Sequence, residues 1–431
     1  MSAKWIKTKI SALASDMTDG PFGSDLKMVH YTDKREARIV QLSNVGEDGW
    51  LDENVKYTTF SHAHEIGRCI IESGNIIVAK MMPAGRAILC PNHEPMFVQG
   101  SDVVKIVPND RINSTFFVYM TKQNDYLKQI EKNTQGSTRA RTSISKLKEI
   151  TLTIPETKEI QNKLAQILVT CDTVIQNTQK TIDKYKAIKQ GMMQDLFTRG
   201  LTKDGKLRPS YKEAPELYKE SELGMIPKEW AETPVIEIGE VISGGTPSTK
   251  NTDFWDGNIP FVTPNDLSVN EGAYITSTER YITVLGLSKS SAIELPKGTL
   301  IISSRAPIGY LAIASFNCVT NQGCKSVVFD SKQAPLFHYY NFQRYVNKMK
   351  SLGSGTTFAE ISKKDVEKLK VSYPLKDEQI AIAKRLSSID STILKEEAVL
   401  EKYKNIKTGL MARLLTPPDD AEIIDETGET L

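Results

Sequence analysis

Hydrophobic residues recur in alternating steps of four and three along two separate stretches of the chain, residues 156–198 and 375–416. The pattern runs from Leu164 to Leu196 in the first stretch and from Ile382 to Leu414 in the second. Such heptad spacing is typical of long helices that pack against a partner through one narrow apolar stripe. At 1.5 Å per residue, each helix would be roughly 60 Å long.

The two stretches are copies of each other. Residues 161–198 align with residues 379–416 at a constant offset of 218, and 14 positions are identical. The best-preserved string reads KYKAIKQGMMQDLFT in the first copy and KYKNIKTGLMARLLT in the second. Pro155 and Pro374 precede the two helices, where a proline is tolerated. We therefore predict a duplicated helix whose two copies pair with each other.

The segments between the helices also repeat, although more weakly. The matching strings are Gly74–Gly85 with Gly298–Gly309, Ile39–Val45 with Phe261–Leu267, Gln99-Gly100 with Gln322-Gly323, and Ile144–Lys146 with Ile361–Lys363. Lys80 and Arg305 are expected at equivalent positions after a buried strand. Short β-branched runs bounded by Gly, Pro and Asn, with some helical spacing, predict mixed α/β (α+β) units.

The chain therefore has the order globular, helix, globular, helix. The expected parts are a first domain at 1–155, a helix at 156–198, a connector at 199–229, a second domain at 230–374, a helix at 375–416 and a disordered acidic tail at 417–431. The tail holds six acidic residues and no Lys or Arg, so it masks a modestly basic body behind the net charge of +2. A basic body is compatible with binding to a polyanion.

Cysteine usage and hydropathy narrow the cellular setting. The five cysteines are an odd, scattered set, which favours reduced thiols in the cytoplasm over a disulfide framework. The first residues lack the apolar core of a secretory signal. No apolar run is long enough for a membrane span, so we expect a cytoplasmic protein.

Candidate catalytic motifs are weak. Methyl transfer to a base amine needs an Asn/Asp-Pro-Pro-Tyr/Phe loop, but Pro417-Pro418 is followed by Asp419. Residues 200–207 nearly spell a phosphate loop, yet they lack its Ser or Thr and follow a helix. The spacing of the zinc candidates fits no standard ligand pattern; they are His62, His64, Cys69, Cys90 and His93. We expect neither a catalytic site nor a bound metal.

The arrangement resembles the specificity subunit of type I restriction-modification systems over nearly the whole chain. The strings that carry this resemblance, besides the two helices, are Gly224–Trp230, Ser243–Ser248, Ser303–Gly309 and Thr320–Gly323. In the first domain, Asp19–Ser24 stands where the second has Ser243–Ser248. Each string is loose by itself, and their order and repetition make the pattern specific.

The resemblance implies two target-recognition domains, each reading one half of a split, asymmetric DNA site. It also implies an antiparallel coiled coil that fixes the gap between the half-sites. The partners would be two modification subunits, which use S-adenosylmethionine to methylate adenine, and restriction subunits, which use ATP and Mg. The chain itself would bind double-stranded DNA and none of these cofactors. The base-reading loops cannot be carried over, because they vary most within the family.

The polar loops before the last strand of each domain are the first candidates for DNA contact. Hydroxyls and backbone N–H groups in such loops contact phosphates, and arginine can grip guanine. The residues concerned are Ser137, Arg139 and Arg141, and, in the second domain, Ser354, Thr356 and Thr357. Lys80 and Arg305 are candidate groove or phosphate contacts.

Further candidates have an equally good structural reading. The turns with Phe22 and Ser24, and with Thr246 and Ser248, either shape the fold or approach DNA. Asn321 and Gln322 can pair with adenine or cap the backbone. The remaining candidates are Asn44, Gln99, Asn265 and Lys325. The lysines of the helices are expected to be solvated or to face partner subunits; they are Lys184, Lys186, Lys189, Lys402, Lys404 and Lys407.

Two alternatives remain open for the function. One is a coiled-coil adaptor that does not bind DNA, which would be indifferent to a phosphate polymer in a salt-dependent binding assay. The other is a self-contained DNA methyltransferase, which would bind S-adenosylmethionine by itself.

Overall fold

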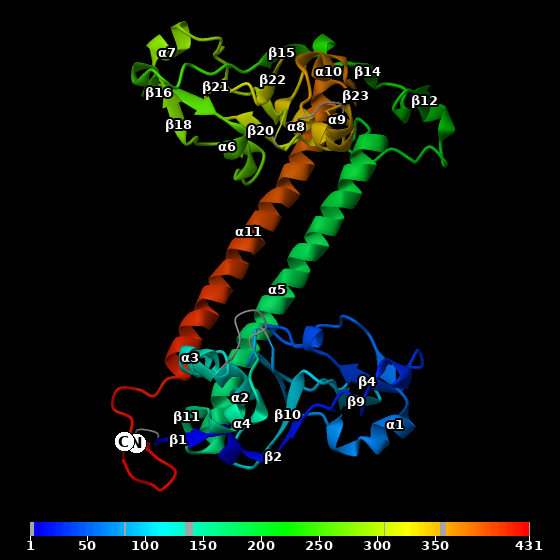
Figure 1. Cartoon of the computed structure of the whole chain (residues 1–431). Helices are drawn as coiled ribbons and strands as arrows, with labels where there is room; N and C mark the ends of the chain where they lie inside the picture. Colours follow the sequence, from blue (N-terminus) through cyan, green and yellow to red (C-terminus); the bar gives the residue numbers. More distant parts are fainter. Residues whose placement is uncertain (1–3, 82, 134–140, 306, 354–358, 431) are drawn as a thin grey trace. The chain divides into compact units, whose positions relative to one another are not determined.

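The computed structural model describes residues 4–81, 83–133, 141–305, 307–353 and 359–430. The chain divides into two compact units, Met1–Thr178 with Val399–Leu431, and Gln179–Ala398. Both divisions fall inside long helices, α5 (Lys158–Thr198) and α11 (Lys376–Leu414), so each unit holds one α/β domain and one end of each helix (Figure 1). The two predicted long helices are therefore confirmed.

The first unit contains sheets of strand order β2-β10-β7-β8, β3-β5-β4-β9-β6 and β11-β1-β24. Its strands are β1 (Trp5–Lys9), β2 (Ala14–Asp19), β3 (Tyr31–Thr32), β4 (Ala37–Val40), β5 (Tyr57–Thr58), β6 (Ile70–Ile71), β7 (Ile76–Ala79), β8 (Ala87–Leu89), β9 (Met96–Gln99), β10 (Val103–Pro108), β11 (Thr151–Pro155) and β24 (Ile423–Ile424). Its helices besides α5 and α11 are α1 (Phe60–Glu65), α2 (Ser114–Met120), α3 (Asn124–Asn133) and α4 (Ile144–Glu149). The core packs one face of the first sheet against α2 and α5, through Val78, Val104, Phe116 and Leu168.

The second unit has a five-stranded sheet of order β15-β22-β19-β20-β17 and a three-stranded sheet of order β18-β16-β21. Its strands are β12 (Tyr218–Ser221), β13 (Gly224–Pro227), β14 (Ala231–Pro234), β15 (Gly239–Ser243), β16 (Trp255–Val262), β17 (Tyr274–Ile275), β18 (Arg280–Ile282), β19 (Leu300–Ser303), β20 (Leu311–Ala314), β21 (Val319–Thr320), β22 (Cys324–Phe329) and β23 (Lys370–Tyr373). Its shorter helices are α6 (Pro264–Ser268), α7 (Val284–Ser288), α8 (Pro335–Gln343), α9 (Val346–Gly353) and α10 (Lys363–Lys368). The core joins α8 to both long helices through Phe197, Phe337 and Leu386.

The two domains repeat one topology. The order β2-β10-β7-β8 recurs as β15-β22-β19-β20, and the parallel pair β4–β9 recurs as β16–β21. The antiparallel pair β1–β11 recurs as β14–β23. The predicted mixed α/β class and internal repeat are thereby confirmed.

A buried glutamine joins each domain to the start of its long helix. The side-chain oxygen of Gln161 accepts a hydrogen bond from the backbone N–H of Asn113 at 2.8 Å, and its amide donates to the carbonyl of Pro155 at 2.9 Å. Gln379 makes the same two contacts, with the N–H of Ala334 at 2.8 Å and the carbonyl of Pro374 at 2.9 Å. The duplication therefore extends to the joint between domain and helix.

Within each unit the two long helices run antiparallel. In the second unit Lys186 pairs with Glu397 at 2.7 Å and Lys189 with Asp390 at 2.6 Å, so the numbering rises along one helix as it falls along the other. In the first unit Lys407 pairs with Asp172 at 2.5 Å. Lys189 and Lys407 are therefore mostly buried and paired, which corrects the expectation that they are solvated or face partner subunits.

The acidic C-terminal segment is ordered, contrary to the expected disordered tail. Strand β24 pairs in parallel with β1, which places Ile423 opposite Trp5. The carboxylate of Glu426 accepts hydrogen bonds from the hydroxyl of Thr8 at 2.6 Å and the backbone N–H of Lys9 at 2.9 Å. The acidic composition masked the short apolar run, which covers an otherwise free edge of β1.

The predicted connector at residues 199–229 also carries structure of its own. It contains the hairpin β12–β13 and a buried arginine, Arg208, whose guanidinium pairs with Glu378 at 2.6 Å and Glu229 at 2.8 Å. The indole of Trp230 donates to the same Glu378 carboxylate at 3.2 Å. The connector is thus packed against the first turn of α11. Among the described residues, no helix is long and apolar enough to cross a bilayer.

Candidate functional site

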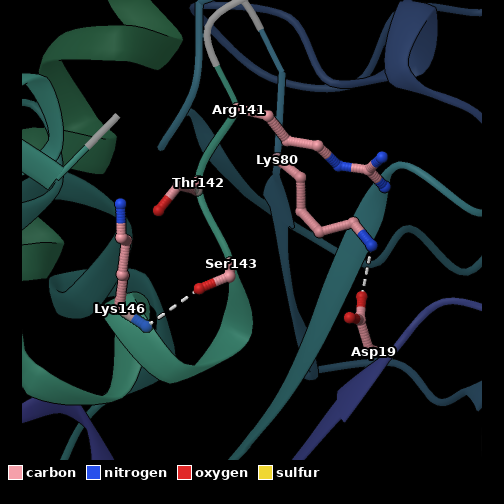
Figure 2. Close-up of a pocket in the computed structure, with 6 residues that line it drawn as sticks. All are labelled: Asp19, Lys80, Arg141, Thr142, Ser143 and Lys146. Carbon is pink, nitrogen blue, oxygen red and sulfur yellow. Dashed lines mark hydrogen bonds and ion pairs between the residues drawn. The ribbon is translucent and has the colours of Figure 1, made fainter. Parts of the chain in front are cut away.

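An open pocket of about 380 Å³ lies in the first domain where the ends of β2 and β7 meet the segment before α4. Its lining residues are Asp19, Lys80, Arg141, Thr142, Ser143 and Lys146 (Figure 2). Strand β10 pairs with both β2 and β7, and Val104 lies opposite both Asp19 and Val78. This register brings Asp19 and Lys80 together at one end of the sheet.

Cationic side chains predominate in the pocket, and each has a partner. The ammonium of Lys80, only 5% exposed, pairs with Asp19. The guanidinium of Arg141 pairs with Asp102 at 3.2 Å, and the ammonium of Lys146 donates to the carbonyl of Asn133 at 2.6 Å. Figure 2 shows Lys80 and Arg141 extending toward the same side of the pocket.

The hydroxyl of Thr142, unlike these cations, lacks a partner in the described part of the chain. The hydroxyl of Thr142 is buried and, among the described residues, makes no hydrogen bond. A buried polar group usually has a partner, so this unpaired hydroxyl is an exception in the wall of the pocket. Three cations against the carboxylates of Asp19 and Asp102 suit a ligand rich in hydrogen-bond acceptors.

Backbone hydrogen bonds define the equivalent place in the second domain. The N–H of Lys80 donates to the carbonyl of Asp102, and its own carbonyl accepts from the N–H of Thr142, both at 2.9 Å. Ser304 makes the same two backbone hydrogen bonds in the second domain. Its N–H donates to the carbonyl of Gly323 at 2.8 Å, and its carbonyl accepts from the N–H of Ile361 at 3.0 Å. Lys80 is therefore equivalent to Ser304.

The structure thereby corrects the predicted equivalence of Lys80 and Arg305. The backbone of Met81 forms an isolated antiparallel β-bridge with that of Arg141, and the backbone of Arg305 forms the same bridge with that of Glu360. Arg305 is therefore equivalent to Met81. Side-chain caps give the same register further along, because Ser143 caps α4 and Ser362 caps α10. The predicted match of Ile144–Lys146 with Ile361–Lys363 is thus wrong by two residues.

The predicted match of Gln99-Gly100 with Gln322-Gly323 is displaced too. The N–H of Gly100 donates to the carbonyl of Val40 at 2.8 Å, and the N–H of Asn321 donates to that of Val262 at 3.2 Å. Gly100 is therefore equivalent to Asn321. Identical letters misled the alignment because the loops of the two domains differ in length.

The second domain carries its own lysine, arginine and carboxylate at this place. The ammonium of Lys325 is 3.2 Å from the hydroxyl of Ser304 and 3.4 Å from a carboxylate oxygen of Glu360. The other oxygen of Glu360 lies 3.8 Å from the guanidinium of Arg305. The side chain of Lys325 is buried, whereas Arg305 is half-exposed.

The structure places the predicted contact residues in three groups. The exposed ones are Phe22, Ser24, Arg141, Ser248, Asn265, Arg305 and Gln322. The partly or fully buried ones that border the clusters or their adjoining turns are Lys80, Thr246, Asn321 and Lys325. Outside the described residues lie Ser137, Arg139, Ser354, Thr356 and Thr357. Within the second group, the hydroxyl of Thr246 donates to the side-chain oxygen of Gln322 at 2.5 Å.

Two predicted contacts have the wrong position for DNA. The fully buried Asn44 uses its amide on the carbonyls of Leu51 and Glu53, at 2.9 and 2.7 Å, and its oxygen on a backbone N–H. The fully buried Gln99 donates to the carbonyls of Thr18 and Val103. Both side chains hold the backbone, so we withdraw them as DNA contacts.

The glycine turns have a demonstrable structural role. A Cβ at Gly20 would lie 2.1 Å from the carbonyl oxygen of Gly100, and one at Gly244 would lie 1.9 Å from that of Asn321. These positions admit only glycine because the backbones cross there. The exposed Phe22 near the first turn stacks under the guanidinium of Arg68 at 5.6 Å.

Sequence reasoning missed the carboxylates of both clusters, Asp19, Asp102 and Glu360. Each lies far along the chain from the cation it contacts, so no local spacing could reveal the pairing.

Within the described ranges of the chain, the cysteines and histidines show no sign of a metal site. Burial raises the pKa of Cys90 and of Cys318 to about 12, which keeps these thiols protonated. No group of three or more His, Cys, Asp or Glu side chains suited to a metal is found among the described residues.

Comparison with known proteins defines the class. A family model described as "Type I restriction modification DNA specificity domain" matches residues 32–187 and 227–403. Each match takes in most of one α/β domain and most of one long helix. The chain belongs to this family.

Individual relatives agree with this assignment. The type I restriction enzyme MjaIX specificity subunit of Methanocaldococcus jannaschii is 38% identical over 198 residues, which are 44% of this chain and 46% of that protein. The HindI specificity subunit of Haemophilus influenzae is 24% identical over 400 residues, covering 80% of this chain and 86% of that protein. The crystal structure of a type I restriction-modification S subunit from M. genitalium has the same fold, with a TM-score of 0.59, 18% identity and 97% of each chain covered.

Proposed function

We propose that this chain is the DNA-binding specificity subunit of a type I restriction-modification complex and has no catalytic site of its own. Each domain reads one half of a bipartite, asymmetric site. Partner subunits methylate adenine and cleave the DNA. The observation that carries the proposal is the double family match, because each match joins one domain to one copy of the duplicated helix.

The mechanism is selection by geometry. Each matched base pair contributes about 1–3 kcal/mol of discrimination, so neither half-site needs to bind tightly alone. Joining the two readers in one chain makes the second half-site's binding effectively intramolecular. A site whose gap differs by one base pair would be rejected, because the second half-site is both shifted and rotated.

The partners follow from the proposed class. Two modification subunits would use S-adenosylmethionine, and restriction subunits would use ATP and Mg, on cytoplasmic DNA. The repeated clusters of Lys, Arg and carboxylate at one place in both domains support DNA binding over a purely structural adaptor.

A domain exchange tests the proposal. Residues 1–155 are replaced by the first domain of a relative, and the chain is expressed with its cognate modification subunit before methylome sequencing. We expect one half of the methylated site to change and the other to persist, and the matched exchange of residues 230–374 to do the reverse. A change in both halves from one exchange would contradict the modular reading. Adaptor function predicts no methylated motif that depends on this chain, and a self-contained methyltransferase predicts methylation without the partner.

A further inference from the structure

Each domain presents one half-exposed arginine against one half-exposed carboxylate at the same place in the fold. In the first domain Arg141 pairs with Asp102 at 3.2 Å, with side chains 51% and 35% exposed. In the second domain Arg305 pairs with Glu360 at 3.8 Å, with side chains 47% and 38% exposed. The two pairs thus offer solvent the same combination of donors and acceptors to nearly the same extent.

The residues that form these pairs are not equivalent to one another. Arg141 lies in the bridge position that Glu360 fills in the second domain, and Arg305 lies where the first domain has Met81. The arginine therefore comes from opposite sides of the same bridge in the two domains. The carboxylates are not equivalent either, because Asp102 lies where the second domain has Gly323. A retained framework would keep the residues, whereas here the charges are kept at different positions.

The buried lysine behind each pair also comes from a different position in each domain. Lys80 has the position in the backbone hydrogen-bond pattern that Ser304 has in the second domain. Lys325 pairs with Ile302 in the sheet, and Val104 pairs with Val78, the equivalent of Ile302. Lys325 is therefore equivalent to Val104 and not to Lys80. One ammonium and one guanidinium at one place, supplied by non-equivalent residues in the two domains, point to a shared ligand.

The carboxylate of each pair favours a base edge over a phosphate as the DNA group that the pair contacts. A phosphate offers only acceptors and a negative charge, so a half-exposed carboxylate beside the arginine would repel it. The major-groove edge of a G·C pair offers two acceptors on guanine, O6 and N7, and an amino donor on cytosine. Arginine grips the guanine acceptors with two N–H groups, and a carboxylate accepts from the cytosine amine.

We propose that each domain reads one G·C base pair of its half-site through this pair, Arg141 with Asp102 in the first domain and Arg305 with Glu360 in the second. The proposal rests on the proposed function and adds a base identity to each half-site. The buried Lys80 and Lys325 hold the surrounding strand ends and are positioning residues.

The test is selection of randomised duplexes by the full-length chain, with wild type compared with Arg141→Gln and Arg305→Gln. We expect Arg141→Gln to lose about ten- to a hundredfold preference at one G·C pair in one half-site, and Arg305→Gln to do so in the other. Arg141→Lys keeps the charge without the two-pronged grip, so it should relax the same position with a smaller loss of affinity. Arg35→Gln is the matched control, since Arg35 is exposed and pairs with Glu94 but does not line the pocket.

The outcomes separate the inference from the function beneath it. A uniform loss of affinity for all sequences, with the salt slope reduced by about one, would identify Arg141 as a phosphate contact and overturn the base assignment. An unchanged motif and affinity would make the pair purely structural and overturn it too. A wild-type motif without G·C in one half-site also contradicts the inference while leaving the proposed function intact. Enrichment of no two-part motif by wild type would instead overturn the proposed function, and this inference with it.

Discussion

Lys189 of α5 pairs with Asp390 of α11 at 2.6 Å, and the same two positions of the duplicated helix pair again in the first unit as Lys407 with Asp172. A tyrosine from the neighbouring domain completes each site, since the hydroxyl of Tyr340 donates to Asp390 at 2.7 Å and that of Tyr119 to Asp172 at 2.5 Å. Burial and these hydrogen bonds raise the pKa of both phenols, so they remain donors at physiological pH.

We predict that this polar level stabilises one helix register. Lys189→Met leaves Asp390 mostly buried with its cation lost, and should cost about 1–2 kcal/mol of unfolding free energy, less than the roughly 3–5 kcal/mol for a fully buried pair. Combining it with Asp390→Leu should cost less than the sum of the two single changes. A double-mutant cycle by chemical denaturation measures this coupling. The exposed pair Lys186–Glu397 is the control, with coupling of about 0.5 kcal/mol or less. Strict additivity at Lys189 and Asp390 would contradict the prediction.

Burial of His338 makes the second unit sensitive to acid. The ring is stacked on Phe329 with centroids 4.5 Å apart, and burial lowers the pKa of this histidine from 6.5 to about 3. Between these values the unfolded chain binds a proton that the folded chain does not, so stability falls as pH falls, by up to about 1.4 kcal/mol per pH unit. His338→Gln should flatten the dependence of unfolding free energy on pH between 6.5 and 5. Equal slopes for the two chains would refute this account.

The joint between domain and helix should depend on Gln161. Gln161→Ala leaves the N–H of Asn113 and the carbonyls of Arg111 and Pro155 without their side-chain partner. Leaving buried polar groups unpaired costs about 1–3 kcal/mol, so the first unit should unfold at lower denaturant concentration. Gln166→Ala on the exposed side of the same helix is the matched control and should change stability by about 0.5 kcal/mol or less. Equal effects of the two changes would mean that the buried amide is not the anchor.

The C-terminal strand should protect the edge of β1. A chain ending at Ala421 loses the hydrogen bond from the N–H of Trp5 to the carbonyl of Glu422 and both contacts of Glu426. Amide exchange at Trp5 and Lys9 should then accelerate by about fivefold, in line with about 1 kcal/mol per hydrogen bond. Glu429→Gln is the control, because this acidic side chain of the same segment is exposed. Unchanged exchange after truncation would show that β24 adds nothing to this edge.

The same contact has a pH dependence. Hydrogen bonds from Thr8 and from the backbone of Lys9 hold the pKa of Glu426 below its usual value. The carboxylate therefore stabilises the edge at neutral pH, and this contribution is lost as pH falls through the lowered pKa.

The sequence predicted the long helices because heptad spacing and 14 identical positions are local signals that survive duplication. It also predicted the two repeated domains. It did not predict that Lys189 and Lys407 pair with aspartates of the opposite helix, since an ion pair across two helices depends on their register. The acidic tail was misread because its composition outweighed the short run Ile423-Ile424.

The candidate site was predicted only in part. Lys80 and Arg305 were named because they follow a buried strand, and Arg141 because it lies in a polar loop; all three remain predicted contacts, as does Lys325. Their correspondence between the domains was not predicted, because loops of unequal length shift the alignment and the charged residues themselves come from non-equivalent positions. Asn44 was misassigned because an amide that holds backbone looks the same in a sequence as one that reads a base.

Gln161 and Gln379 form the same attachment site for a domain, here called the socket, since each amide makes the same two hydrogen bonds to the backbone of its domain. Under the proposed function, a chain carrying its first domain in both sockets would treat its two half-sites alike. Its target would then hold the same half-site sequence twice, so any difference between the two half-sites would come from the domains and not from the helices that carry them.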